Sequence, residues 1–226
     1  MGQRAHKSIV VIFAREPILG TVKTRLAAGV GDCLALSIYR AFLADLLGHL
    51  PTGSWEVRVA VAGDPQSFAE SFGLDPLACF AQEGGDLGER MDAAFQRVLG
   101  EGLWDRCLLV GADMPHLEVS ALALADAALA MGEADVVLGP ALDGGYYLVA
   151  MARPYAIFSE IDWSTDVVLK QTRARVQKMG LRTKLLPPSF DVDTVADLDR
   201  LAAWLAGREP GVLPHTRAVL AEYLRA

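Results

Sequence analysis

Cysteine is scarce in this chain, and the few cysteines present lack the spacing of a metal site or a disulfide framework. The sequence of 226 residues contains 3 of them, at Cys33, Cys79 and Cys107. No two form a C-x-x-C pair, and an odd, widely spaced set does not suit a network of disulfides. We therefore expect a reduced, cytoplasmic protein without a structural zinc site.

Long hydrophobic runs and a surplus of basic residues are also missing. The apolar run at residues 9–14 is far shorter than the roughly 20 residues of a membrane-spanning helix, and Arg15 and Glu16 end it too early for a secretory signal. The chain has 21 Lys and Arg against 28 Asp and Glu, a net charge of -7. Such an acidic chain is a poor binder of nucleic acid, so we expect no nucleic-acid partner and no membrane span.

Apolar residues, by contrast, are abundant, at 52% of the sequence, which is enough for a large core. We predict one domain over residues 1–226, with a core at about 8–206 and a helical extension at 207–226. Buried-type strands alternate with helices, which indicates an α/β fold with a mostly parallel sheet. Residues 146–151 follow the preceding strand too closely for a helical crossover, so we expect that strand to be antiparallel.

The predicted elements follow from apolar periodicity and from turn residues. Strands are expected over residues 8–14, 56–62, 77–81, 107–110, 135–139, 146–151 and 181–186, and helices over 32–47, 87–98, 118–131, 165–178 and 194–206. A short helix is expected to begin at Pro65, residues 15–31 are expected to form a loop, and a last helix is expected after residue 214.

The loop after the first strand is the main basic cluster of the chain. Its sequence is F-A-R-E-P-I-L-G-T-V-K-T-R-L, with positive charges at Arg15, Lys23 and Arg25. Gly20 allows a ligand to approach the backbone closely. The loop follows a strand end, where open α/β sheets bind their ligands, and this position favours phosphate binding over an ordinary solvated loop. The GxxxxGK[ST] spacing of a P-loop is absent.

Acidic residues at two places are candidate metal ligands. Asp113 follows the strand C-L-L-V, and a carboxylate at a strand end projects into the ligand crevice, although it can also be a turn residue. Asp191 and Asp193 lie on the same side of an extended D-V-D segment. Thr194 and Asp197 fit a capping-box variant, so part of this acidic segment can serve the helix start. One late acid together with Asp113 would complete a magnesium or manganese site.

Three further segments have weaker signals. Asp143-Gly144-Gly145 predicts a turn that a ligand can approach, and equally a hairpin. The segment 84–88, G-G-D-L-G, offers amide groups to an anion or is a simple turn into a helix. We interpret His116 as a surface or capping histidine, and residues 163–165, W-S-T, as a helix cap with a hydrophobic anchor.

Taken in order, these motifs resemble those of a known family. The motifs FAREP..G.VKTRL, Q.GGDLGERM, GADMPHL, GPALDGGYYLVAM, IDWST and FDVDTVADL, over residues 8–205, are similar to an uncharacterised bacterial family of GT-A-type, glycosyltransferase-like or nucleotide-diphospho-sugar transferase proteins. Its wider superfamily includes the molybdenum-cofactor guanylyltransferase and phospholactate guanylyltransferase. The resemblance implies a three-layer α/β/α sandwich, a nucleotide over the first loop and a divalent metal at Asp113. Arg15 stands where the family pattern has Lys.

The resemblance also assigns roles to single residues. Lys23 and Arg25 match residues that face phosphates, Asp191 or Asp193 matches the late acid, and Asp143 lies on the acceptor side. The resulting prediction has catalytic residues Lys23, Arg25, Asp113 and Asp143, nucleotide-binding residues Arg15, Gly20, Lys23, Arg25, Gln82, Asp86 and Arg90, and metal ligands Asp113, Asp191 and Asp193.

The function predicted from these residues is that of a transferase dependent on Mg²⁺ or Mn²⁺. Its partners would be a nucleoside triphosphate or a nucleotide-diphospho-sugar and a small-molecule acceptor with a phosphate or a hydroxyl. The single acid at the strand end and the late D-x-D-T segment favour nucleotidyl transfer, in which pyrophosphate leaves. The alternatives are a glycosyltransferase that uses a nucleotide-diphospho-sugar and a non-catalytic nucleotide-binding module on the same fold.

Overall fold

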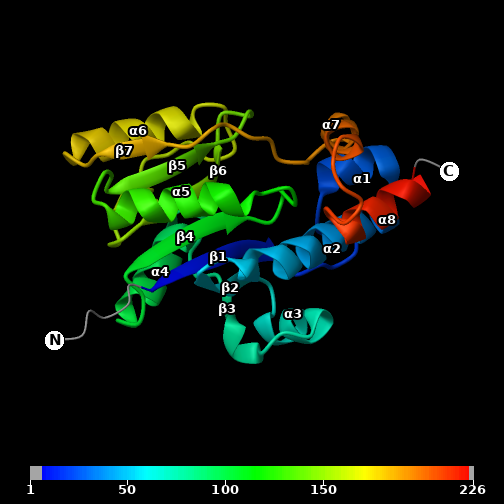
Figure 1. Cartoon of the computed structure of the whole chain (residues 1–226), viewed down its shortest axis with the longest axis horizontal. Coiled ribbons are helices and arrows are strands. Elements are labelled where there is room, and N and C mark those ends of the chain that lie inside the picture. Colours follow the sequence, from blue (N-terminus) through cyan, green and yellow to red (C-terminus); the bar gives the residue numbers. More distant parts are fainter. Residues whose placement is uncertain (1–6, 224–226) are drawn as a thin grey trace.

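A central sheet of seven strands organises the computed structural model, which describes residues 7–223 (Figure 1). The strand order is β3-β2-β1-β4-β6-β5-β7. The central strand β1 is a continuous β-branched run whose residues Ile9 to Ile12 are fully buried, as a strand covered on both faces must be. The strands are β1 (Ser8–Arg15), β2 (Trp55–Ala62), β3 (Cys79–Ala81), β4 (Arg106–Gly111), β5 (Val136–Pro140), β6 (Tyr146–Met151) and β7 (Thr183–Leu185).

One strand, β6, runs against the others. It pairs antiparallel with β4 on one side and with β5 on the other, whereas the β1–β2, β1–β4, β2–β3 and β5–β7 pairs are parallel. The five residues between β5 and β6 are too few for a helical crossover, so the chain turns back on itself. The prediction of a mostly parallel, mixed sheet is therefore confirmed.

Helices cover both faces of the sheet, which makes three layers (Figure 1). Alternate residues of β1 face opposite sides, so Val10 and Ile12 pack with α2, α3 and α5, while Ile9 and Val11 pack with α4 and α6. The helices are α1 (Thr24–Val30), α2 (Asp32–His49), α3 (Pro65–Phe72), α4 (Leu87–Gly100), α5 (Val119–Ala130), α6 (Val168–Lys178), α7 (Val195–Ala206) and α8 (Pro214–Tyr223), with 3-10 turns η1 (Leu50–Thr52) and η2 (Pro76–Ala78).

A third apolar cluster joins α1, α2, α7 and α8 at one end of the molecule (Figure 1). It includes Leu26, Phe42, Leu198 and Leu220, all almost fully buried. The expectation of a continuous loop over residues 15–31 is wrong, because α1 forms within it. Such a short helix is not stable alone, and its stability comes from packing against α2 and α7.

Capping residues decide where several helices begin. Thr194 and Asp197 form the predicted capping box at the start of α7, and Asp64 caps α3. Helix α6 begins at Val168 and not at the predicted residue 165, because the Thr165 hydroxyl donates to the carbonyl of Asp162 and closes a turn before the helix. The predicted domain over 1–226 stays a prediction, and its residues 1–6 and 224–226 lie outside the described part.

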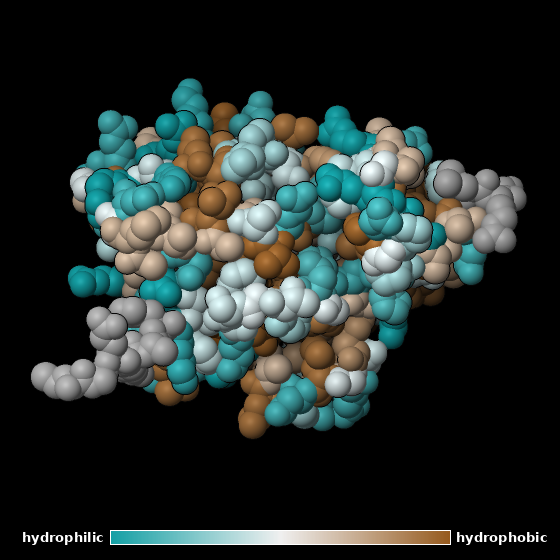
Figure 2. Space-filling model, viewed as in Figure 1, coloured by the Kyte–Doolittle hydropathy of each residue, from teal (hydrophilic) through white to brown (hydrophobic). Residues whose placement is uncertain are grey.

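One helix passes a simple test for a membrane span. The segment Asp32–Thr52 is long and apolar enough by length and composition, but half of it is buried inside the protein, as in a core helix. On the face shown in Figure 2, hydrophobic residues are interspersed with hydrophilic ones. The three cysteines are free, with Cys33 exposed and Cys79 and Cys107 buried.

Candidate functional site

A pocket of about 570 Å³ opens at the edge of the sheet where β1 and β4 end. Because β6 is antiparallel, its first residues reach the same edge as the last residues of β1 and β4. The pocket is therefore lined by Phe13 and Arg15 from β1, Asp113 after β4, and Tyr146 at the start of β6. Open α/β sheets bind their ligands at this edge.

Lys23 is the centre of the polar end of this pocket. Its Nζ lies 2.6 Å from Oδ1 of Asp113 and 2.9 Å from Oδ1 of Asp193, and it donates to the carbonyl of Val192 at 2.7 Å. Its side chain is only 2% exposed, whereas those of Asp113 and Asp193 are 49% and 35% exposed. Burial lowers the Lys23 pKa, but the two carboxylates more than offset it, so its pKa is raised and the ammonium stays charged.

Within the protein, Lys23 contacts acidic and backbone groups, and its predicted contact with phosphate stays a prediction. The sequence assigns Lys23 to phosphate contact, but its three donors are directed at two carboxylates and a backbone carbonyl. Its backbone is left-handed, with φ 50 at the N-cap of α1, which turns the side chain inward. The structure thus brings Lys23, Asp113 and Asp193 together as one ion cluster.

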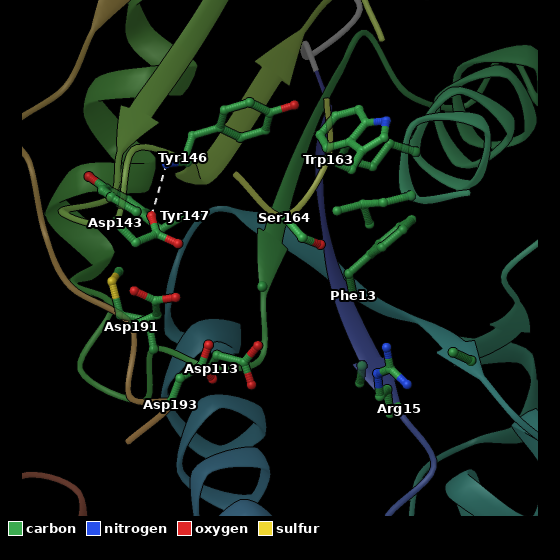
Figure 3. Close-up of a pocket in the computed structure, with 18 of the residues that line it drawn as sticks. Phe13, Arg15, Asp113, Asp143, Tyr146, Tyr147, Trp163, Ser164, Asp191 and Asp193 are labelled. Carbon is green, nitrogen blue, oxygen red and sulfur yellow. Dashed lines mark hydrogen bonds between the residues drawn. The ribbon is translucent and has the colours of Figure 1, made fainter. Parts of the chain in front are cut away.

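Two more carboxylates lie above this cluster (Figure 3). Burial raises the pKa of Asp191 to about 6, and the negative charges of Asp143, Asp193 and Asp113 add to the effect. Asp143 accepts a hydrogen bond from the amide of Gly145 at 2.8 Å, which fixes its turn. Asp193 and Asp113 therefore share the Lys23 ammonium. Asp191 is not in contact with Lys23, and Asp143 is the nearby charge that affects its pKa most. Within residues 7–223, no group of three acidic, His or Cys side chains is arranged to hold a metal ion by itself.

The basic residues of the pocket come from other elements. Arg15 ends β1, Arg25 is in the first turn of α1 and Arg90 lies on α4; all three line the pocket, and their contact with a nucleotide stays a prediction. In Figure 3, the labelled carboxylates lie on one side and Arg15 on the opposite side. The Arg90 Nε donates to the carbonyl of Gly84, which ties that side chain to the G-G-D loop. The pocket thus has its labelled carboxylates, with Lys23 between two of them, on one side and Arg15 on the other.

Two predicted nucleotide-binding residues, Gln82 and Asp86, use their side chains in hydrogen bonds within the protein. The Gln82 side chain lines the pocket, but its amide donates to the carbonyls of Ala14 and Ala60. Asp86 is the N-cap of α4, where its carboxylate accepts from the amide of Glu89. Gly20 has φ +75 in an exposed turn, and neither Gly20 nor Asp86 lines the pocket.

The upper part of the pocket has an aromatic wall, of which the sequence predicts Tyr146, on the acceptor side, but gives no pocket role to Phe13 or Trp163. Phe13, Tyr146 and Trp163 line it together with Ser164 (Figure 3). Residues 163–165 were interpreted as a helix cap, but Ser164 has a left-handed backbone with φ 65, which is rare outside glycine. Residues 163–165 line the pocket because of the conformation of their loop. The residue pattern does not specify that conformation, so the sequence alone could not predict that these residues line the pocket.

His116 is also placed differently from the prediction of a surface or capping histidine. It is buried, with its ring 4.2 Å from that of Phe190 and 5.2 Å from that of Trp204. Burial and the nearby Arg208 lower its pKa to about 4, so the ring is neutral. His116 is thus a packing residue between the strand β4 end and α7.

Gly144 is a residue whose replacement tests how the turn is held. A Cβ there would collide with the carbonyl of Asp166, and its backbone has φ +93. We expect Gly144→Ala to lower the free energy of unfolding by about 3 kcal/mol, from clash and strain together. Gly31→Ala is the control, since Gly31 has φ +84 but nothing within 4 Å of its Cβ position. Urea unfolding should show a smaller loss for Gly31→Ala, and equal losses would contradict the clash.

Sequence comparison places the chain in a family. The family model "Uncharacterized protein conserved in bacteria (DUF2064)" matches residues 48–165, more than half of the chain. This protein belongs to the DUF2064 family. The matched part of this DUF2064 protein carries Asp113, Asp143, Tyr146 and Trp163, whereas Lys23 and the late acids lie outside it. No curated protein matches the chain.

Solved structures share the fold of this DUF2064 protein. A Desulfovibrio desulfuricans G20 protein assigned as a nucleotide-diphospho-sugar transferase matches with a TM-score of 0.86 and 31% identity, over 96% of this chain and 98% of that one. A cytidylyltransferase from Leptospira borgpetersenii matches with a TM-score of 0.56 and 13% identity, over 97% and 96%. CMP:2-keto-3-deoxy-manno-octonic acid synthetase, solved with CTP, matches with a TM-score of 0.53 and 15% identity, over 88% and 98%. The predicted α/β/α fold of the nucleotide-diphospho-sugar transferase type is confirmed, while a specific relationship to guanylyltransferases stays a prediction.

Proposed function

We propose that this DUF2064 protein is a transferase for nucleotide-activated substrates, and that it transfers a nucleotidyl group with the help of Mg²⁺ or Mn²⁺. The observation that carries the proposal is the division of one pocket into two charged sides. Asp113 and Asp193 flank the buried Lys23 on one side, Arg15 lies on the opposite side, and Arg25 also lines the pocket. A triphosphate with its metal ion needs both kinds of charge at once.

The carboxylates present fit a magnesium ion that shares its coordination with phosphates. Asp113 and Asp193 converge from two segments, and both remain partly exposed to the pocket. Mg²⁺ is commonly bound by one or two carboxylates together with water and substrate phosphates, so a cage of three protein ligands is not required. Asp113 and Asp193 would therefore hold the ion, and Lys23, which contacts both, would orient the two carboxylates. When bound, the ion offsets the charge that develops on a leaving pyrophosphate.

The side chains of the chain itself supply the other parts of the reaction. In nucleotidyl transfer, an acceptor oxygen forms a bond to the α-phosphorus while the bond from this phosphorus to the oxygen of the departing pyrophosphate breaks. Arg15 and Arg25 pair with the pyrophosphate oxygens and orient them. One carboxylate of the pair Asp143 and Asp191, which Lys23 does not contact, accepts the proton that the acceptor hydroxyl loses.

The comparisons support the class of reaction in this proposal, which is transfer from a nucleotide-activated substrate. The Desulfovibrio protein is assigned as a nucleotide-diphospho-sugar transferase, and two other structural relatives are a cytidylyltransferase and a synthetase solved with CTP. The DUF2064 protein would accordingly take a nucleoside triphosphate as its donor. The same comparisons are also compatible with sugar transfer. The following experiment distinguishes sugar transfer from nucleotidyl transfer.

We expect CTP or GTP with Mg²⁺ to stabilise the protein against heat more than CDP-glucose, GDP-mannose or UDP-glucose does. At a ligand concentration of 100 times Kd, the gain is about 2.7 kcal/mol, which corresponds to roughly 5–10 °C in Tm for a chain of this size. Thermal unfolding and pyrophosphate release are the measurements. A preference for a diphospho-sugar, with slow hydrolysis to free sugar, would make the protein a glycosyltransferase. Binding without turnover across an acceptor screen would make it a nucleotide-binding module.

A further inference from the structure

Strand β1 extends beyond the point where its neighbour β4 leaves the sheet. The two strands pair as far as Phe13 and Gly111, and one more bond joins the amide of Ala112 to the carbonyl of Phe13 at 3.2 Å. The chain then turns away at Asp113. Alternate residues of a strand direct their N–H and C=O to the same neighbour, so those of Arg15 face the place that β4 has left. The backbone of Arg15 therefore needs another partner there.

The hydroxyl of Tyr39, from α2, supplies that partner. The amide of Arg15 donates to the Tyr39 oxygen at 2.8 Å, and the Tyr39 hydroxyl donates to the carbonyl of Arg15 at 3.3 Å. Tyr39 is only 3% exposed. Burial and the nearby charge of Asp113 raise the pKa of its hydroxyl, which therefore keeps the proton that it donates. One side chain thus satisfies both backbone groups of Arg15.

The side chain of Arg15 has no comparable anchor. It lines the pocket opposite the labelled carboxylates (Figure 3). Within residues 7–223, the hydrogen bonds of Arg15 to side chains are those of its backbone to Tyr39, and its guanidinium forms no ion pair. A long side chain without contacts keeps most of its rotamer freedom, so its reach into the pocket depends on where its backbone is held. The bonds from Tyr39 fix the point from which this side chain extends.

We propose that Tyr39 is a positioning residue for Arg15. Its hydroxyl holds the end of β1 where β4 no longer does, so that the Arg15 guanidinium can reach the phosphates of a bound nucleotide. Tyr39 acts through Arg15 and not through its own contact with the ligand. The role of Arg15 toward phosphate rests on the proposed function, whereas the bonds between Tyr39 and the Arg15 backbone do not.

A double-mutant cycle tests the proposal. Tyr39→Phe removes the hydroxyl and keeps the ring that packs in the core. The affinity for CTP or GTP with Mg²⁺ is measured by calorimetry, well below each Tm, for the wild type, Tyr39→Phe, Arg15→Gln and the double variant. Tyr39→Phe should lower the affinity by about fivefold or more when Arg15 is present, and by less than about twofold in Arg15→Gln, because its effect passes through the guanidinium.

Thermal unfolding separates positioning from a purely structural role. The hydroxyl bonds to the backbone of residue 15, so Tyr39→Phe should lower the Tm equally with Arg15 and with Arg15→Gln. Trp55→Phe is the control, because it removes a buried bond to the carbonyl of Leu50 in the same apolar cluster but outside the pocket lining. It should lower the Tm and leave nucleotide affinity unchanged.

The outcomes distinguish this inference from the proposed function. An unchanged affinity in Tyr39→Phe, or an equal loss with and without Arg15, would overturn the positioning role while nucleotide binding by the wild type stands. No binding of CTP or GTP by the wild type would reject the proposed function and this inference with it.

Discussion

Replacing Asp113 by Asn should abolish the part of nucleotide binding that depends on Mg²⁺. The carboxylate lies directly after β4 and is 49% exposed toward the pocket, so it is the most accessible charge of the ion cluster. Loss of a residue that only orients a metal ligand typically costs 10–100-fold in affinity, and loss of a ligand itself should cost at least about 100-fold. Calorimetric titration of CTP or GTP with Mg²⁺ and with EDTA measures the two contributions separately.

The fold should survive this replacement, which makes the result interpretable. Lys23 retains its contact with Asp193 at 2.9 Å and its bond to the carbonyl of Val192. Asp64→Asn is a matched control, because Asp64 caps α3 and asparagine caps helices equally well. Equal Mg²⁺-dependent affinities for the wild type and Asp113→Asn would remove Asp113 from the metal site.

Replacing Lys23 by Met should affect both stability and binding. The ammonium is 2% exposed and lies between two carboxylates, so its removal leaves Asp113 and Asp193 facing each other without a counter-charge. Breaking a buried ion pair costs about 3–5 kcal/mol, but these acids are partly hydrated, so we expect a loss of about 2 kcal/mol. That loss corresponds to a fall of roughly 4–8 °C in Tm, and nucleotide affinity should fall about tenfold or more because the bare carboxylates repel phosphate.

The unliganded protein distinguishes two roles for Lys23. A lysine that only contacts phosphate would leave the Tm of the nucleotide-free protein unchanged or raise it, since removing it relieves the cost of a buried charge. A lysine that holds the acid pair lowers that Tm when it is lost. Lys23→Arg keeps the charge and should retain more stability than Lys23→Met. Thermal unfolding without ligand is the deciding measurement, and identical Tm values for wild type and Lys23→Met would refute the ion-cluster role.

Much of the fold was predictable because its signals are local. The run of β-branched residues in β1, the Asp64-Pro65 start of α3 and the Thr194 to Asp197 capping box each specify their own element. The antiparallel direction of β6 followed from the length of one connection. Helix α1 was missed since its stability comes from packing against α2 and α7, which no window of sequence contains.

The candidate site was predictable in its residues but not in their partners. The strand-end position of Asp113 and the D-V-D pattern predicted acidic residues at one edge of the sheet, and the structure has Asp113, Asp191 and Asp193 line one pocket there. The sequence did not decide whether Asp191 or Asp193 lies beside Asp113. The two residues are 78 and 80 positions further along the chain (191 − 113 and 193 − 113), so their distances from Asp113 depend on the whole fold. The burial of Lys23 depends on its left-handed backbone and on the position of the segment that carries Asp193. The sequence pattern shows neither, so it predicts a basic loop where the structure has a buried ion cluster.

The ion cluster also has a consequence for folding during synthesis, because its residues are made at different times. Lys23 and Asp193 are separated by 170 positions in sequence, and the amide of Val192 donates to the carbonyl of Asp113. At a translation rate of roughly 5–20 residues per second, Asp193 is synthesised about 10–30 s after Lys23. During that interval, Lys23 on a ribosome-bound chain lacks both acidic partners until Asp113 is made, and then still lacks Asp193. The contact between Lys23 and Asp193 can therefore form only after residue 193 has left the ribosome.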